Sequence, residues 1–104
     1  MTLTTYVNFA GQCADAFRYY ETHLGGRILF LMTHAEAPVP GGVPPEWKDA
    51  VLHGRLSLGG TELAGADIPN AAPMRSAYLT LAVTSDSEAE RVYAALADGG
   101  RMLM

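Results

Sequence analysis

Residues 5–32 have the sequence TYVNFAGQCADAFRYYETHLGGRILFLM, and this stretch decides the fold. Its first residues alternate polar and apolar side chains of types that suit a half-buried strand. Gly11 ends this run, and apolar residues then recur at the spacing of an amphipathic helix face. They are Cys13, Ala16, Phe17, Tyr20 and Leu24. Because Gly25–Gly26 offers a left-handed residue that ends a helix, the stretch predicts strand, helix and a second strand from Arg27.

The stretch from Val51 to Asp67 has the pattern of a β-hairpin. Val51–Leu58 and Thr61–Ala66 are the expected strands, and Gly59–Gly60 favours a two-residue turn between them. Such a turn places Ser57 opposite Glu62 and gives the hairpin two faces. The polar face carries His53, Arg55, Ser57, Glu62, Ala64 and Ala66, and the other carries Leu52, Leu56, Leu58 and Leu63. We expect the leucine face to lie under a helix and the polar face to open on water or a cavity.

Residues 77–104 repeat the order of the opening stretch. Alternation predicts a strand over Ala77–Thr84, and Ser85-x-x-Glu88 predicts a capping box, with Ser87-x-x-Glu90 as a competing register. The apolar face of the following helix consists of Ala89, Val92, Tyr93, Leu96 and Ala97. Gly99–Gly100 is expected to end this helix, and Arg101–Met104 to begin another strand.

The opening stretch also resembles a known family. Residues 6–20 follow the pattern Tyr-x-Asn-Phe-x-Gly-x-Cys-x-x-Ala-Phe-x-Tyr-Tyr, and residues 24–28 follow Leu-Gly-Gly-x-Ile. This pattern resembles the PhnB-like branch of the glyoxalase/bleomycin-resistance/dioxygenase (vicinal oxygen chelate) superfamily. The likeness continues at His53-Gly-Arg-Leu, Gly59–Gly60, Ala66–Asp67 and residues 79–100.

The resemblance implies an α+β fold built from two βαβββ-type modules of the glyoxalase/bleomycin-resistance kind. Module one would cover residues 1–67, a linker with Pro69 and Pro73 would cover 68–76, and a partial module two would cover 77–104. The second module is then truncated after its helix and second strand. All parts are expected to form a single domain, because 104 residues do not supply two independent cores.

Composition and charge exclude several classes of protein. A hydrophobic content of 49% with 17% charged residues is that of a globular chain, and a formal charge of −4 with scattered basic residues argues against a nucleic-acid partner. No apolar run approaches the roughly 20 residues of a membrane span, and the N-terminus lacks a signal pattern, so we expect no membrane partner. The single cysteine fits a reducing, cytoplasmic location, and its place on the apolar helix face predicts a packed thiol.

The metal site of the superfamily does not carry over to this sequence. Metal-using members place His or Glu ligands on the first and last strands of each module. The matching positions here fall on Thr5 within about a residue, near Gly65 and on Tyr78, with the fourth beyond the sequence. A divalent metal needs several converging nitrogen, oxygen or thiolate donors, so we expect neither metal nor cofactor. A methyltransferase activity is also unsupported, because the chain lacks a glycine-rich strand-to-helix turn.

The candidate binding residues are those of the polar hairpin face together with two aromatic residues: His53, Arg55, Ser57, Glu62, Tyr78 and Trp47. A small molecule bound in a sheet-lined cavity is the leading hypothesis, and a metal-dependent lyase or dioxygenase of the same superfamily is the alternative. The plainer interpretation of Arg55 and Glu62 is an exposed ion pair. Trp47 lies in the proline-rich stretch 34–50, where it would either anchor the loop or form part of a lid over a pocket or partner.

A homodimer is the expected assembly. A truncated second sheet would leave unpaired backbone groups near Arg101–Met104, and an exposed sheet edge invites strand addition. Twofold symmetry is the commonest way to cover such an edge. The apolar tail and the loop around Trp47 are the residues from which we expect the interface to be built.

Overall fold

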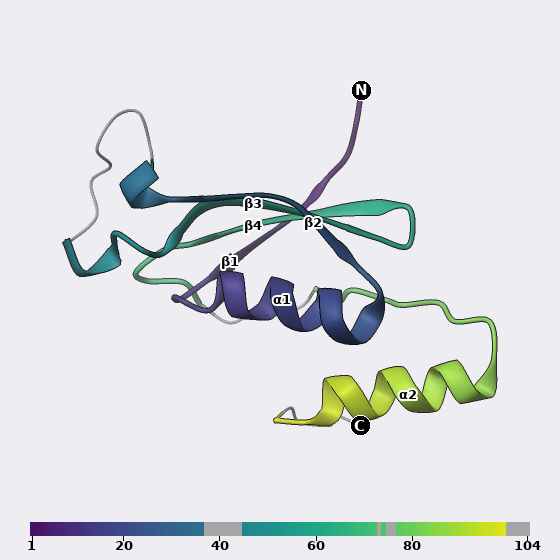
Figure 1. Cartoon of the computed structure of the whole chain (residues 1–104). Coiled ribbons are helices and arrows are strands. Elements are labelled where there is room, and N and C mark those ends of the chain that lie inside the picture. Colours follow the sequence, from purple (N-terminus) through teal and green to yellow (C-terminus); the bar gives the residue numbers. More distant parts are fainter. Residues whose placement is uncertain (37–44, 73, 75–76, 100–104) are drawn as a thin grey trace. The chain divides into compact units, whose positions relative to one another are not determined.

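The computed structural model describes residues 1–36, 45–72, 74 and 77–99 (Figure 1). They fall into two compact units, Met1–Pro73 and Met74–Met104. The first unit contains four strands and a helix. Two short 3₁₀ turns, over His34–Glu36 and Pro45–Trp47, lie between the second and third strands in the sequence. The elements are β1 (Thr5–Phe9), α1 (Cys13–Leu24), β2 (Arg27–Thr33), β3 (Val51–Leu58) and β4 (Thr61–Asp67). Each strand and helix predicted for this part of the sequence is confirmed.

The four strands form one sheet in the order β1-β4-β3-β2 (Figure 1). β1 runs parallel to β4, whereas β3 is antiparallel to both β2 and β4. The β3–β4 turn has positive φ at Gly59 (59°) and Gly60 (81°), and it pairs Ser57 with Glu62 as predicted. This arrangement is a βαβββ module, and the α+β fold class is confirmed.

Helix α1 packs closely on one face of the sheet because two paired glycines make room for Phe17. Gly54 on β3 is opposite Gly65 on β4. A Cβ at Gly65 would lie 3.1 Å from Cζ of Phe17, and a Cβ at Gly54 would lie 3.2 Å from its Cε2. Phe17 is fully buried in this core together with Cys13, Val51 and Leu56. Any larger residue at either glycine would push the helix away from the sheet.

The leucine face of the hairpin is confirmed at Leu56 and Leu63, but one assignment was wrong. Leu56 is fully buried and Leu63 packs against the same core. At the start of β3, Val51 is the core residue, 2% exposed, and Leu52 is only half-buried. The cause is a register shift of β2 against β3 between Met32 and Thr33, which breaks the simple alternation of faces.

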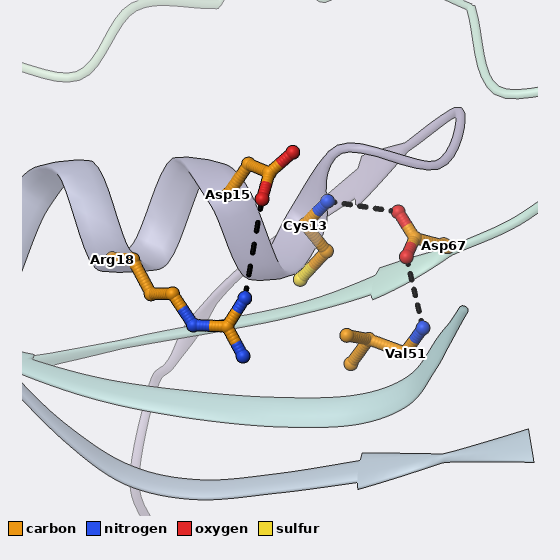
Figure 2. Close-up of polar contacts among 5 residues, drawn as sticks. All are labelled: Cys13, Asp15, Arg18, Val51 and Asp67. Atoms are coloured by element: carbon orange, nitrogen blue, oxygen red, sulfur yellow. Dashed lines mark hydrogen bonds and ion pairs between the residues drawn. The ribbon is translucent and has the colours of Figure 1, made fainter. Parts of the chain in front are cut away.

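The buried carboxylate of Asp67 joins three segments of the first unit. Its Oδ1 accepts hydrogen bonds from the backbone N–H groups of Gly11 and Cys13, both at 3.0 Å, and its Oδ2 accepts one from Val51 at 2.9 Å. Figure 2 shows the contacts with Cys13 and Val51. Asp67 is only 2% exposed. Because a buried charge needs hydrogen-bond partners, these three donors make its burial tolerable.

Asp67 also supplies what the start of α1 lacks. Gln12 occupies the N-cap position, but its side chain makes no capping hydrogen bond within the helix and accepts from Ala10 N–H instead. The first helical N–H group, at Cys13, is satisfied by Asp67 from the end of β4. A negative charge at this position also suits the positive end of the helix dipole. The other end of α1 closes as predicted, with Gly25 left-handed at φ 73°.

The second unit contains helix α2 (Asp86–Ala97). Ser85 is its N-cap and accepts from Glu88 N–H at 3.1 Å, so the Ser85 register is confirmed over its competitor. Glu88 in turn accepts from the backbone and hydroxyl of Thr84, and these hydrogen bonds lower the pKa of the Glu88 carboxyl. Gly99 follows the helix at φ 74°.

The strand predicted over Ala77–Thr84 was wrong, since those residues form no strand in the part of the chain that the structure describes. In the first unit, β1 is hydrogen-bonded only to β4, the last strand of its module. The corresponding segment of the second unit has no such strand to pair with among the described residues. Alternation of side chains therefore did not suffice to form a ladder. The strand predicted over Arg101–Met104 lies outside the described residues.

We predict that Asp67→Asn lowers the free energy of unfolding by about 2 to 4 kcal/mol, because it turns one acceptor oxygen toward a backbone donor as an NH₂ group. Urea unfolding followed by circular dichroism measures the change. Asp15→Asn is the matched control, since Asp15 makes only an exposed contact with Arg18 at 3.9 Å (Figure 2). The control is expected to stay within about 0.5 kcal/mol of the wild type. Equal effects of the two substitutions would contradict the role given to Asp67.

Candidate functional site

The sheet has a second face, opposite α1, which we call the open face. Strand pairing defines it by a row of neighbours across all four strands: Tyr6, Ala64, Arg55 and Phe30. Alternation along β3 and β4 adds His53, Ser57, Glu62 and Ala66 to this face. The structure therefore brings four of the predicted site residues together: His53, Arg55, Ser57 and Glu62.

Aromatic rings from three strands meet on the open face around His53. The Tyr6 ring from β1 stacks on the imidazole, with ring centroids 5.9 Å apart and an angle of 21° between planes. The Phe30 ring from β2 lies at 6.0 Å and is tilted by 50°. Tyr6 is 50% exposed and Phe30 is 42% exposed, so both rings are accessible to a ligand.

The Tyr6 hydroxyl and the His53 imidazole are joined by a hydrogen bond of 3.3 Å between the Tyr6 oxygen and Nδ1. Burial, with a smaller contribution from Cys13, raises the pKa of the Tyr6 hydroxyl above its ordinary value. The phenol is therefore protonated at neutral pH and keeps its ability to donate. A neutral histidine with one nitrogen occupied in this way still has its second nitrogen for another partner.

Charged and small side chains complete the face. Arg55 forms an ion pair with Glu62, as predicted, and both side chains are partly exposed. Ser57 lies opposite Glu62 and is half-buried. Ala64 is 4% exposed, because it lies between the larger side chains of Tyr6 and Arg55 in the same row. An exposed ion pair of this kind contributes little to stability.

The other two predicted site residues lie elsewhere. The Trp47 indole lies next to the turn between β1 and α1, with its Cη2 atom 4.0 Å from the position of a Cβ at Gly11. Backbone hydrogen bonds from Ala35 to Lys48 and from His34 to Ala50 hold the two ends of the loop together. These contacts favour the anchor interpretation of Trp47 over the lid. Tyr78 belongs to the second unit, where it is 80% exposed.

Sequence reasoning missed Tyr6 and Phe30 as members of the site. Tyr6 and Phe9 point to opposite faces of β1, and Phe9 packs against the core. Knowledge of the β1–β4 pairing would therefore have placed Tyr6 on the open face. Phe30 was harder to place, because β2 shifts register against β3 between Ile28 and Phe30. A bulge reverses the face that simple alternation assigns, and nothing in the local sequence marks it.

The structure also tests where the superfamily's metal positions fall. Thr5 and Gly65 belong to rows that face α1, and their neighbours on the open face are Tyr6, Ala64 and Ala66. Within residues 1–36, 45–72, 74 and 77–99, no three His, Cys, Asp or Glu side chains are grouped so that they could hold a metal ion. In the same ranges, no helix is long and apolar enough to cross a membrane.

Cys13 is a packed thiol, as predicted. It is fully buried in the core beneath α1. Burial, and secondarily the negative charge of Asp67, raises the pKa of its thiol to about 12. Since the thiolate is the reactive form, both the burial and the raised pKa disfavour nucleophilic chemistry at this side chain.

Comparison with known proteins gives three informative similarities. The chain is 34% identical to protein PA1353 from Pseudomonas aeruginosa, with a TM-score of 0.80 over 95% of this chain and 74% of that one. It is 28% identical to protein YjdN from Escherichia coli, over 100% of this chain and 78% of YjdN. A PhnB protein from Bacillus cereus, named as a candidate 3-demethylubiquinone-9 3-methyltransferase, shares the fold at a TM-score of 0.70 and 22% identity, over 100% of this chain and 79% of that one. No protein-family model matches the chain.

We predict that Cys13 resists alkylation in the folded protein. Iodoacetamide at about pH 8 should leave the native thiol unmodified, because a group with a pKa near 12 is almost wholly protonated there. Mass spectrometry counts the added groups. Unfolding in guanidinium chloride is the control and should give complete modification. Rapid alkylation of the native chain would show that the thiol is accessible and ionised.

Proposed function

Because the chain belongs to the PhnB-like branch of the glyoxalase/bleomycin-resistance/dioxygenase superfamily, we propose that it binds a small molecule on the open face, without the superfamily's metal site. One observation supports this proposal above the others. Tyr6 and Phe30 surround His53 on a sheet face that α1 does not cover, and both rings are about half exposed. Exposed aromatic groups beside a few polar ones are typical of ligand sites.

The two faces of the sheet differ in a way that supports this choice. On the α1 side, Phe17 fills the space over Gly54 and Gly65 so closely that a Cβ would be crowded at either position. That face has no room for a ligand. On the open face, His53 and Arg55 supply polar groups beside aromatic rings. A ligand there would gain apolar contact and directional hydrogen bonds at the same time.

Metal-dependent lyase or dioxygenase chemistry is the alternative, and elemental analysis separates it from our proposal. Protein purified without chelators or added metal is expected to contain zinc, nickel and iron at well below one atom per chain. Stoichiometric metal that disappears on His53→Ala would identify His53 as a ligand and overturn the metal-free proposal.

The binding itself is tested by a small-molecule library screened by thermal shift and by NMR. We predict that ligands raise the midpoint of unfolding and perturb the signals of His53 and Arg55, and that His53→Ala weakens their binding about tenfold or more. His23→Ala is the control, because His23 is an exposed histidine on α1. Ligands whose affinity falls equally in both variants, or that perturb only residues away from the open face, would contradict the proposed site.

We also propose that the protein is a homodimer. The second unit has large apolar side chains that are exposed, and such groups favour association. They are Tyr78 at 80%, Leu79 at 55%, Leu81 at 44%, Tyr93 at 56% and Leu96 at 42% exposed. A second copy of the chain is the expected partner, because twofold pairing buries the same apolar surface on both chains. The interface should exceed about 1,000 Å² in total.

Sedimentation velocity at micromolar concentration tests the dimer. The wild type is expected to sediment as a dimer, and Tyr93→Glu as a monomer, because the new charge lies within the apolar stripe of α2. Ala94→Glu adds the same charge beside this stripe and should leave the dimer intact. A wild type that is monomeric at every concentration would refute the assembly.

Charge and cysteine chemistry support two further proposals, on the class of partner and on the cellular compartment. The formal charge of −4 and the few basic residues support a partner other than nucleic acid. Cys13 is a buried free thiol, which supports a reducing compartment such as the cytoplasm.

A further inference from the structure

The hydrogen bond between Tyr6 and His53 bears on which imidazole nitrogen can donate to a ligand on the open face. Only Nδ1 of the imidazole lies within hydrogen-bond distance of the Tyr6 hydroxyl, at 3.3 Å. In a neutral histidine, one nitrogen carries the proton and the other accepts, so the direction of the hydrogen bond to Tyr6 and the tautomer depend on each other. If the phenol donates to Nδ1, the proton of the imidazole is on Nε2.

We propose, on the basis of the proposed function, that Tyr6 is a positioning residue that fixes His53 with its proton on Nε2, and that the open face therefore selects planar carboxylates. The Nε2–H group would donate to a carboxylate oxygen of the ligand. The flat part of the ligand would lie against the rings of Tyr6 and Phe30. A conjugated or aromatic acid is the chemical class that offers both features.

The neighbouring charges support a negatively charged ligand. Arg55 lies between Ala64 and Phe30 in the row that begins with Tyr6, so it shares the open face with these rings. Its present partner is Glu62, through one of its terminal nitrogens. A guanidinium has five N–H donors in a planar fork, so donors are left for a second carboxylate.

The aromatic part of the proposal depends on exposure as well as on ring geometry. Tyr6 and Phe30 lie on either side of His53, at centroid distances of 5.9 Å and 6.0 Å, and come from the two edge strands of the sheet. Each keeps close to half of its surface exposed. Stacking on such rings favours a flat ligand over a puckered one of equal charge, because only the flat ligand contacts a ring over its whole area.

The tautomer is tested first, without any ligand. Long-range ¹H–¹⁵N correlation spectra at about pH 8.5, where an ordinary imidazole is neutral, should show His53 with a protonated Nε2 and a hydrogen-bonded, unprotonated Nδ1. In Tyr6→Phe, the Nδ1 signal is expected to move downfield, because its donor is lost. Tyr19→Phe is the matched control, since Tyr19 forms a similar ring pair with His23 on α1, at 4.1 Å. A protonated Nδ1 in the wild type, or an unchanged Nδ1 in Tyr6→Phe, would overturn the tautomer assignment.

Benzoate is the probe for the ligand class. It should perturb the signals of Tyr6, Phe30 and His53, and bind at least about fivefold more tightly than cyclohexanecarboxylate, which has the same charge but is not planar. Benzyl alcohol, planar but uncharged, should also bind more weakly. Tyr6→Phe is expected to weaken benzoate binding about 3- to 10-fold, and Tyr19→Phe to leave it unchanged.

The outcomes separate this inference from the function on which it rests. Equal affinity for benzoate and cyclohexanecarboxylate would overturn the planar class. If benzoate fails to bind but another ligand occupies the open face, the carboxylate class is wrong and the proposed function stands. If no ligand of the library occupies that face, the proposed function itself fails, while the NMR result still decides the state of His53.

Discussion

The Asp67 carboxylate accepts hydrogen bonds from Gly11, Cys13 and Val51, three backbone groups that are far from it in sequence. These donors belong to the turn after β1, the start of α1 and the start of β3. One buried side chain therefore sets where the helix begins relative to two strands. With α1 held there, Phe17 comes to lie over Gly54 and Gly65, and the core closes beneath the helix.

The division of the sheet into a filled face and an open face follows from this arrangement. On the side that α1 covers, Phe17 and Leu56 are fully buried. The opposite side carries Tyr6 and Phe30, whose rings each lie against the imidazole of His53. The proposed binding residues of the first unit therefore lie on the face that the helix leaves uncovered. The buried groups beneath the helix, Cys13 among them, serve packing.

Local sequence signals predicted much of this fold, and they failed where long-range pairing decides. Gly25, Gly59 and Ser85 act through their own turns or caps, and each was placed correctly from sequence. The bulges between β2 and β3 depend on how the two strands pair, so Val51 and Phe30 could not be assigned to their faces in advance. The strand expected at 77–84 failed for the same reason, because alternation does not supply a partner strand.

The candidate site was predicted in part, for a related reason. His53, Arg55 and Glu62 come from one hairpin, whose register its two-glycine turn fixes locally. Tyr6 and Phe30 join them from strands whose registers only the folded sheet defines.

A soluble paramagnetic gadolinium chelate, added to dilute protein, tests whether the two faces of the sheet differ in exposure. Strong broadening of the side-chain signals of Tyr6, Phe30 and His53 is expected, with the signals of Phe17 and Leu56 unaffected. Protection of His53 and Phe30 equal to that of Phe17 would contradict it.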